Sequence, residues 1–141
     1  MSMTKRERCM AAVKGEKPDK IPYSLWSHMP QFDHDADAIT EKTYEFYKTY
    51  DVDFIKTMNN GMYSIEDFGA VIDYSEVAKG GMAKLVSTPI ETAEDWTKLT
   101  VKPLTAGAIA RELHYLEMIL EKVKADDVPV IFTVFTPITT A

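Results

Sequence analysis

The sequence has few of the residues that cross-link a chain or anchor it in a membrane. It contains a single cysteine, Cys9, which cannot form an internal disulfide and has no partner for a Cys-x-x-Cys motif. Residues 1–20 carry Lys5, Arg6 and Arg8 without a following apolar segment, and no apolar run reaches the length of a membrane span. We therefore expect a cytoplasmic protein without membrane contact.

An excess of positive charge is also lacking. Lysine and arginine number 16 against 22 aspartates and glutamates, which gives a net charge of -6 and a pI near 5.0. This balance argues against non-specific binding of nucleic acid or anionic membranes, because phosphate backbones require clustered cations. The Gly-rich nucleotide motifs, His-Glu-x-x-His and Gly-x-Ser-x-Gly are absent as well. With 45% hydrophobic residues, residues 1–141 have the composition of a soluble globular domain with a sizeable core.

Helical and strand patterns alternate along the chain. Thr4 and Glu7 form a capping box that predicts a helix over residues 4–14. Further helices are predicted over 35–50, 92–99 and 109–123, and Thr136 followed by Pro137 indicates the start of another. Short apolar runs predict strands at 21–26, 53–58 and 129–135. This order predicts an α/β fold with a parallel sheet, and residues 70–89 are predicted to add a hairpin.

The loop after the first predicted strand contains a candidate catalytic residue. His28 can act as a general acid or base, since imidazole titrates near neutrality. The structural alternative is that His28 bonds a backbone carbonyl while Trp26, a candidate for substrate binding, fills space above the strands. Both interpretations stay open. His34 lies among three aspartates, a run more typical of a solvated helix start than of a cation site, so no metal ligand is assigned.

The loop after the second predicted strand offers amide, phenol and carboxylate groups to a polar ligand. Its candidate substrate-binding residues are Asn59, Asn60, Tyr63 and Glu66. The two asparagines are equally suited to form a turn, because asparagine tolerates positive φ, and Glu66 can instead cap a short helix. The loop after residues 129–135 offers only Thr136, for which a capping role is the stronger explanation.

Four segments resemble the amino-terminal part of the uroporphyrinogen decarboxylase family: residues 4–22, 51–55, 88–99 and 133–141. The resemblance implies a (β/α)8 barrel with lyase or methyltransferase activity, of which this chain would supply the first three strands, because a closed barrel takes roughly 250 residues. The decarboxylases of porphyrin biosynthesis hold substrate carboxylates with an Arg-Gln-Ala-Gly-Arg loop, and residues 27–31 contain no arginine. Their aspartate at the end of strand two is matched here by Met58, Asn59 and Asn60.

Residues 64–71 look more like the methyltransferases of the family, which move a methyl group between a corrinoid and a zinc-activated thiol. The zinc ligands of those enzymes lie in the later half of the barrel, so zinc and corrinoid are implied only for a full-length member. We expect a decarboxylase-like or methyltransferase-like barrel fragment that binds a tetrapyrrole-related or other small ligand and is not an authentic uroporphyrinogen decarboxylase. The alternative is a non-catalytic assembly module. In either case the edge of the third strand should self-associate or pair with a complementary carboxyl-terminal fragment.

Overall fold

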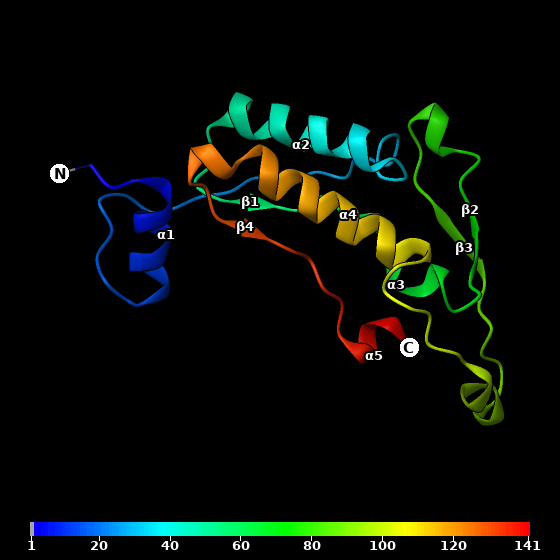
Figure 1. Cartoon of the computed structure of the whole chain (residues 1–141). Coiled ribbons are helices and arrows are strands. Elements are labelled where there is room, and N and C mark those ends of the chain that lie inside the picture. Colours follow the sequence, from blue (N-terminus) through cyan, green and yellow to red (C-terminus); the bar gives the residue numbers. More distant parts are fainter. Residues whose placement is uncertain (1) are drawn as a thin grey trace.

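The computed structural model describes residues 2–141 and consists of short strands and longer helices (Figure 1). In chain order its elements are α1 (Lys5–Val13), α2 (Ala36–Tyr50), β1 (Ile55–Lys56), α3 (Tyr63–Glu66), β2 (Val71–Asp73), η1 (Val77–Lys79), β3 (Lys84–Ser87), η2 (Ala93–Lys98), α4 (Gly107–Lys122), η3 (Lys124–Asp126), β4 (Val130–Ile131) and α5 (Pro137–Thr140). No helix of these residues is long and apolar enough to cross a membrane.

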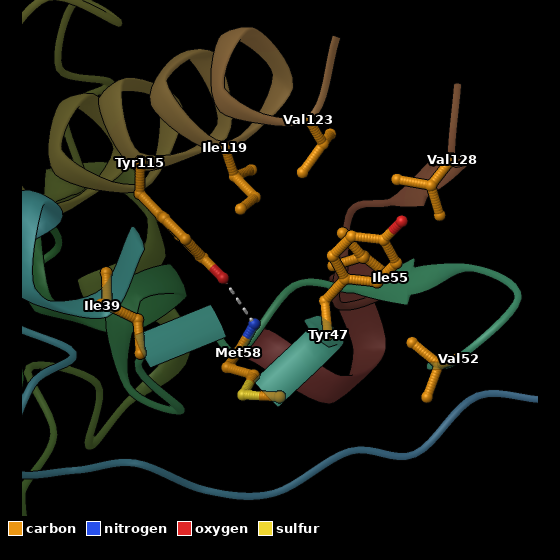
Figure 2. Packing of buried hydrophobic residues seen from close by; sticks show 9 residues of the cluster. All are labelled: Ile39, Tyr47, Val52, Ile55, Met58, Tyr115, Ile119, Val123 and Val128. Atoms are coloured by element: carbon orange, nitrogen blue, oxygen red, sulfur yellow. Dashed lines mark hydrogen bonds between the residues drawn. The ribbon is translucent and has the colours of Figure 1, made fainter. Parts of the chain in front are cut away.

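A parallel pair of strands carries the two long helices on one side. β1 pairs with β4, so that Ile55 lies opposite Val130 and Lys56 opposite Ile131. Helices α2 and α4 lie side by side over this pair (Figure 1). Their apolar faces and the strands enclose the core, shown in Figure 2, which consists of Ile39, Tyr47, Val52, Ile55, Met58, Tyr115, Ile119, Val123 and Val128. The opposite face of the strand pair is not covered by these helices.

A hydrogen-bonded tyrosine fixes the centre of this core. The Tyr115 hydroxyl on α4 accepts a bond from the Met58 backbone N–H at 3.1 Å (Figure 2) and shares a second bond of 2.7 Å with Thr43 Oγ1 of α2. Because buried polar groups require partners, these two bonds let a tyrosine occupy the core and fix α2, α4 and the chain after β1 relative to one another. The helix packing thus sets the position of the loop that follows β1.

The predicted strand at residues 21–26 does not form, which corrects the expectation of three parallel strands. Residues 21–26 belong to no strand or helix, and the Tyr23 carbonyl accepts one bond from Asp53 N at 2.8 Å. The Tyr23 N–H is bonded instead to the Asp53 carboxylate at 3.1 Å, and Pro22 has no N–H to donate. A ladder along this edge therefore lacks the N–H donors of Pro22 and Tyr23. Of the other two predicted strands, residues 53–58 form a strand only at their centre, as β1, and residues 129–135 only near their beginning, as β4.

The predicted hairpin is confirmed. β2 and β3 are antiparallel, with a register shift between Val71 and Ile72. The two ends of the segment that contains the hairpin, residues 68–106, lie close together. They are held there because the Asp67 carboxylate accepts bonds from the N–H groups of Ala108 at 3.0 Å and Ile109 at 3.1 Å. Asp67 thereby caps α4 from a distant part of the sequence, satisfying N–H groups that a helix start leaves free.

Helix α1 is fixed to the rest of the fold by a buried arginine. The predicted capping box is confirmed, with Thr4 and Glu7 bonding each other's backbone N–H groups. Arg8 donates to the carboxylate of Asp53 at 2.6 Å and to that of Asp19 at 2.7 and 3.0 Å. These bonds hold the pKa of Asp19 well below its usual range. Arg8 therefore links the first helix to the residues that precede β1.

Candidate functional site

Thr57, the residue directly after β1, joins the loops at the carboxyl ends of the parallel strands. Its carbonyl accepts a bond from the Trp26 indole N–H at 3.2 Å, and its hydroxyl accepts one from Thr133 N at 3.1 Å. Tyr63 completes the connection, since its hydroxyl donates to the Thr133 carbonyl at 2.9 Å. Parallel (β/α) proteins place their sites at this end of the sheet. Trp26 and Tyr63 thus belong to one hydrogen-bonded group at the expected end.

His28 and a lysine that the sequence analysis missed lie against the Trp26 indole. The His28 ring meets the indole edge-on, with ring centroids 4.3 Å apart and an interplanar angle of 69°. On the same indole, the Nζ atom of Lys56 lies 4.3 Å from a ring centroid. His28 is exposed, Trp26 is 39% exposed and Lys56 is half-buried. A cation and an imidazole therefore stand beside an accessible aromatic surface.

The asparagines of the second loop are buried and bonded within the protein. The Asn59 amide donates to Glu112 of α4 at 2.9 Å. The Asn60 amide donates to Asp33 at 3.0 Å, and its carbonyl oxygen accepts a bond from Met62 N at 2.8 Å. These contacts satisfy the amide groups and fix the loop after β1.

Glu66 likewise has an intramolecular partner. Arg111 donates to both of its carboxylate oxygens, at 3.2 and 2.9 Å, and to Glu112 at 3.1 Å. Burial raises the pKa of Glu112 and that of Asp33 above their ordinary values. Burial also raises the pKa of the Tyr63 hydroxyl. This network joins α3, α4 and both loops, and it gives the buried carboxylates partners that reduce the cost of their desolvation.

Chemically, the two sides of the site differ. The network around Arg111 holds the loops in place with its polar groups already paired. The exposed Trp26 and His28 and the half-buried Lys56 form the other, open side of the site. That open side can bind a ligand through stacking, charge and an imidazole that donates or accepts a proton. Lys56 was not among the predicted site residues, although the sequence contains a signal for it. Side chains alternate along a strand, so a lysine next to Ile55, which faces the core, points to the opposite face.

None of the described residues is assigned to the zinc site that the resemblance implies for full-length members. Among residues 2–141 there is no group of three histidine, cysteine, aspartate or glutamate side chains placed to hold a metal ion. The Cys9 thiol is buried and donates to the Asp53 carbonyl at 3.4 Å, before β1 and away from the loops after it. No chemical step through zinc or a corrinoid is assigned to these residues.

An apolar cavity of about 460 Å³ lies between α3, the β2–β3 hairpin, η2 and α5. Ile65, Phe68, Leu85, Trp96 and Pro137 are among its lining residues. It contains none of the candidate residues Trp26, His28, Asn59, Asn60, Tyr63 and Glu66. The polar site at the strand ends and this cavity are therefore separate features.

Comparison with known proteins agrees with this architecture. The sequence profile of the family described as Uroporphyrinogen decarboxylase (URO-D) matches residues 4–141. Among solved structures, a methyltransferase from Methanosarcina mazei matches with a TM-score of 0.78 and 19% identity, over 99% of this chain and 44% of that chain. At this identity the likeness concerns the fold. No curated protein matches the sequence.

The molecule is thus a mixed α/β protein that is similar in fold to part of a barrel-type methyltransferase. The chain belongs to the uroporphyrinogen decarboxylase family. It spans less than half the length of the methyltransferase that it matches.

Proposed function

We propose that this chain forms the ligand-binding amino-terminal part of a cytoplasmic methyltransferase-like or divergent decarboxylase-like protein. The observation that carries the proposal is the convergence of Trp26, Tyr63 and Thr133 on Thr57 at the carboxyl end of β1. The ligand would be a small polar molecule, tetrapyrrole-related compounds included, bound on the open face beside His28. There the imidazole can serve as a general acid or base toward the bound ligand.

Decarboxylation of uroporphyrinogen itself is not part of this proposal. Several substrate carboxylates would need cationic partners, and residues 27–31 contain no arginine. The position matched to the strand-two aspartate holds Met58, Asn59 and Asn60, none of which carries a charge. The two asparagines are already bonded, to Glu112 and Asp33. A developing pyrrole cation would therefore lack its anionic partner.

The test is incubation of the chain, alone and supplied with a carboxyl-terminal portion of the family barrel, with uroporphyrinogen. No coproporphyrinogen should form above the level of a protein-free control. Formation of this product in either case would contradict the exclusion. In parallel, methyl transfer from methylcobalamin to a thiol should be followed by the cobalamin spectrum. Activity in the completed protein that is absent without this chain would support the methyltransferase assignment.

A second candidate function is a non-catalytic module that assembles with another chain. It is favoured by apolar side chains exposed at and beyond β4, where Ile131 is 49%, Val134 74% and Ile138 91% exposed. Exposed apolar surface beside an unpaired strand edge favours association. Sedimentation at micromolar concentrations tests this proposal: self-association or capture of an added carboxyl-terminal portion supports it. A monomer that binds no such portion contradicts it.

A further inference from the structure

Lys56 occupies the face of the strand pair that the helices leave open. Its strand neighbour Ile55 is 3% exposed and belongs to the core beneath α2 and α4. Successive side chains of a strand point to opposite faces, so Lys56 points away from this core. Its register partner Ile131 is 49% exposed, as expected for that open face. In a closed barrel the face opposite the helices is the interior.

The charge of Lys56 has no carboxylate partner. No carboxylate oxygen of residues 2–141 lies within 4.0 Å of its Nζ atom. Its neighbour is the Trp26 indole at 4.3 Å, whose N–H is fixed by the Thr57 carbonyl. The aromatic face attracts the ammonium group without neutralising it. Lys56 is therefore held in place with its charge still available to a ligand.

We infer that Lys56, Trp26 and His28 form a recognition site for the carboxylate group of a small-molecule ligand. The ammonium group supplies the charge, the indole fixes its position, and the exposed His28 ring can add a hydrogen bond. A single ammonium without a cluster of backbone N–H groups suits a monoanionic carboxylate better than a phosphate dianion, which draws on several donors at once. The inference rests on the proposed function only in placing the ligand at the carboxyl end of β1.

Lys56 would thus supply the cation that residues 27–31 lack. Lys56 lies in the second predicted strand, whereas residues 27–31 belong to the loop after the first predicted strand, and both lie toward the same end of the sheet. One ammonium group matches one carboxylate, so the site binds a single carboxylate of its ligand at this position. The class of ligand that follows is a small molecule that carries a carboxylate. This is compatible with the exclusion of uroporphyrinogen, because the other carboxylates of that molecule would still lack cationic partners.

The experiment uses the whole chain and benzoate as the probe, with benzamide as its uncharged counterpart. Trp26 and Trp96 are the two tryptophans, so a Trp96→Phe variant assigns the Trp26 indole N–H signal in a 15N NMR spectrum. Benzoate should shift this signal saturably, and benzamide should bind at least tenfold more weakly. Lys56→Met should weaken benzoate binding at least tenfold, because it removes a charge-assisted contact. Lys56→Arg keeps the positive charge and should bind benzoate with nearly the wild-type affinity. Lys17→Met, at an exposed lysine without an ion pair, is the matched control.

Equal affinity for benzoate and benzamide in the wild-type chain would overturn the inference without recourse to any variant. Unchanged benzoate affinity in a folded Lys56→Met variant, or tighter binding of inorganic phosphate than of benzoate, would also overturn it. Because the assay needs no turnover, its result is distinct from that of the proposed function. A chain that binds benzoate through Lys56 but supports no methyl transfer refutes only the enzymatic proposal.

Discussion

Replacement of Arg8 by methionine should cause a large loss of stability. The side chains of Arg8 and Asp53 are 7% and 1% exposed, and their ion pair is 2.6 Å long. Without Arg8 the buried Asp53 carboxylate keeps one N–H bond from Tyr23 and a distant Lys20 ammonium at 3.8 Å. Removing one partner of a buried ion pair costs about 3–5 kcal/mol. Asp19 is partly exposed and can be rehydrated, so it should add little.

The loss corresponds to a decrease in melting temperature of about 10–17 °C for a chain of this size. Thermal unfolding followed by circular dichroism measures it, at a protein concentration kept constant to hold any association fixed. Arg6→Met is the matched control on the same helix, because the Arg6 and Asp127 side chains are 52% and 58% exposed and such pairs contribute about 0–1 kcal/mol. Adding Asp53→Asn to Arg8→Met should recover part of the loss. Equal melting temperatures for Arg8→Met and Arg6→Met would refute this account of how α1 is held.

Three further changes test other parts of the fold and site. Gly107→Ala should destabilise the protein more than Gly80→Ala. Both glycines have positive φ, but only at Gly107 would an added Cβ lie 2.0 Å from Asp67 Oδ1. Equal losses of melting temperature would contradict this. Burial raises the pKa of Glu112 above 4.5, so the contribution of Glu112 to stability should fall as pH rises from 4.5 through its folded pKa. The free energy of unfolding of the wild type, measured by urea relative to that of Glu112→Gln, should therefore decrease over this range; a constant difference would contradict this. His28→Ala should weaken benzoate binding while leaving the melting temperature nearly unchanged, and a large decrease in melting temperature would instead assign His28 a structural role.

Local signals predicted much of the fold. The capping box of Thr4 and Glu7, the glycine pair at 80–81 and the helical spacing of residues 109–123 each correspond to an element of the structure. The strand at 21–26 was mispredicted because its apolar composition says nothing about hydrogen-bond partners. There the Asp53 side chain takes the Tyr23 N–H that a ladder would use. The start of α4 at Gly107 carried no local cap signal, since its cap is Asp67.

For the site, the sequence could indicate which loops carry polar groups but not toward which face each group points. Asn59 and Glu112 are far apart in the sequence, and only the packing of α4 against the chain after β1 brings them to 2.9 Å. Lys56 was overlooked because it lies inside a strand, where lysine is ordinarily assigned to a solvent-facing surface. Its significance depends on the indole of Trp26, which is contributed by a different segment.

The meeting of Asp67 with Ala108 has a consequence for how this protein can vary. Bonds of 3.0 and 3.1 Å hold the ends of residues 68–106 together. This segment, which contains the hairpin and η2 and is called the cassette below, is therefore fixed at both ends. The entropic cost of closing a loop rises only slowly with its length. The cassette can therefore be lengthened, trimmed or exchanged between relatives while β1, β4 and their helices stay in register. A cut within the cassette would leave the cap of α4 in place. Changes in the sequence of this region therefore need not disturb the pairing of β1 with β4.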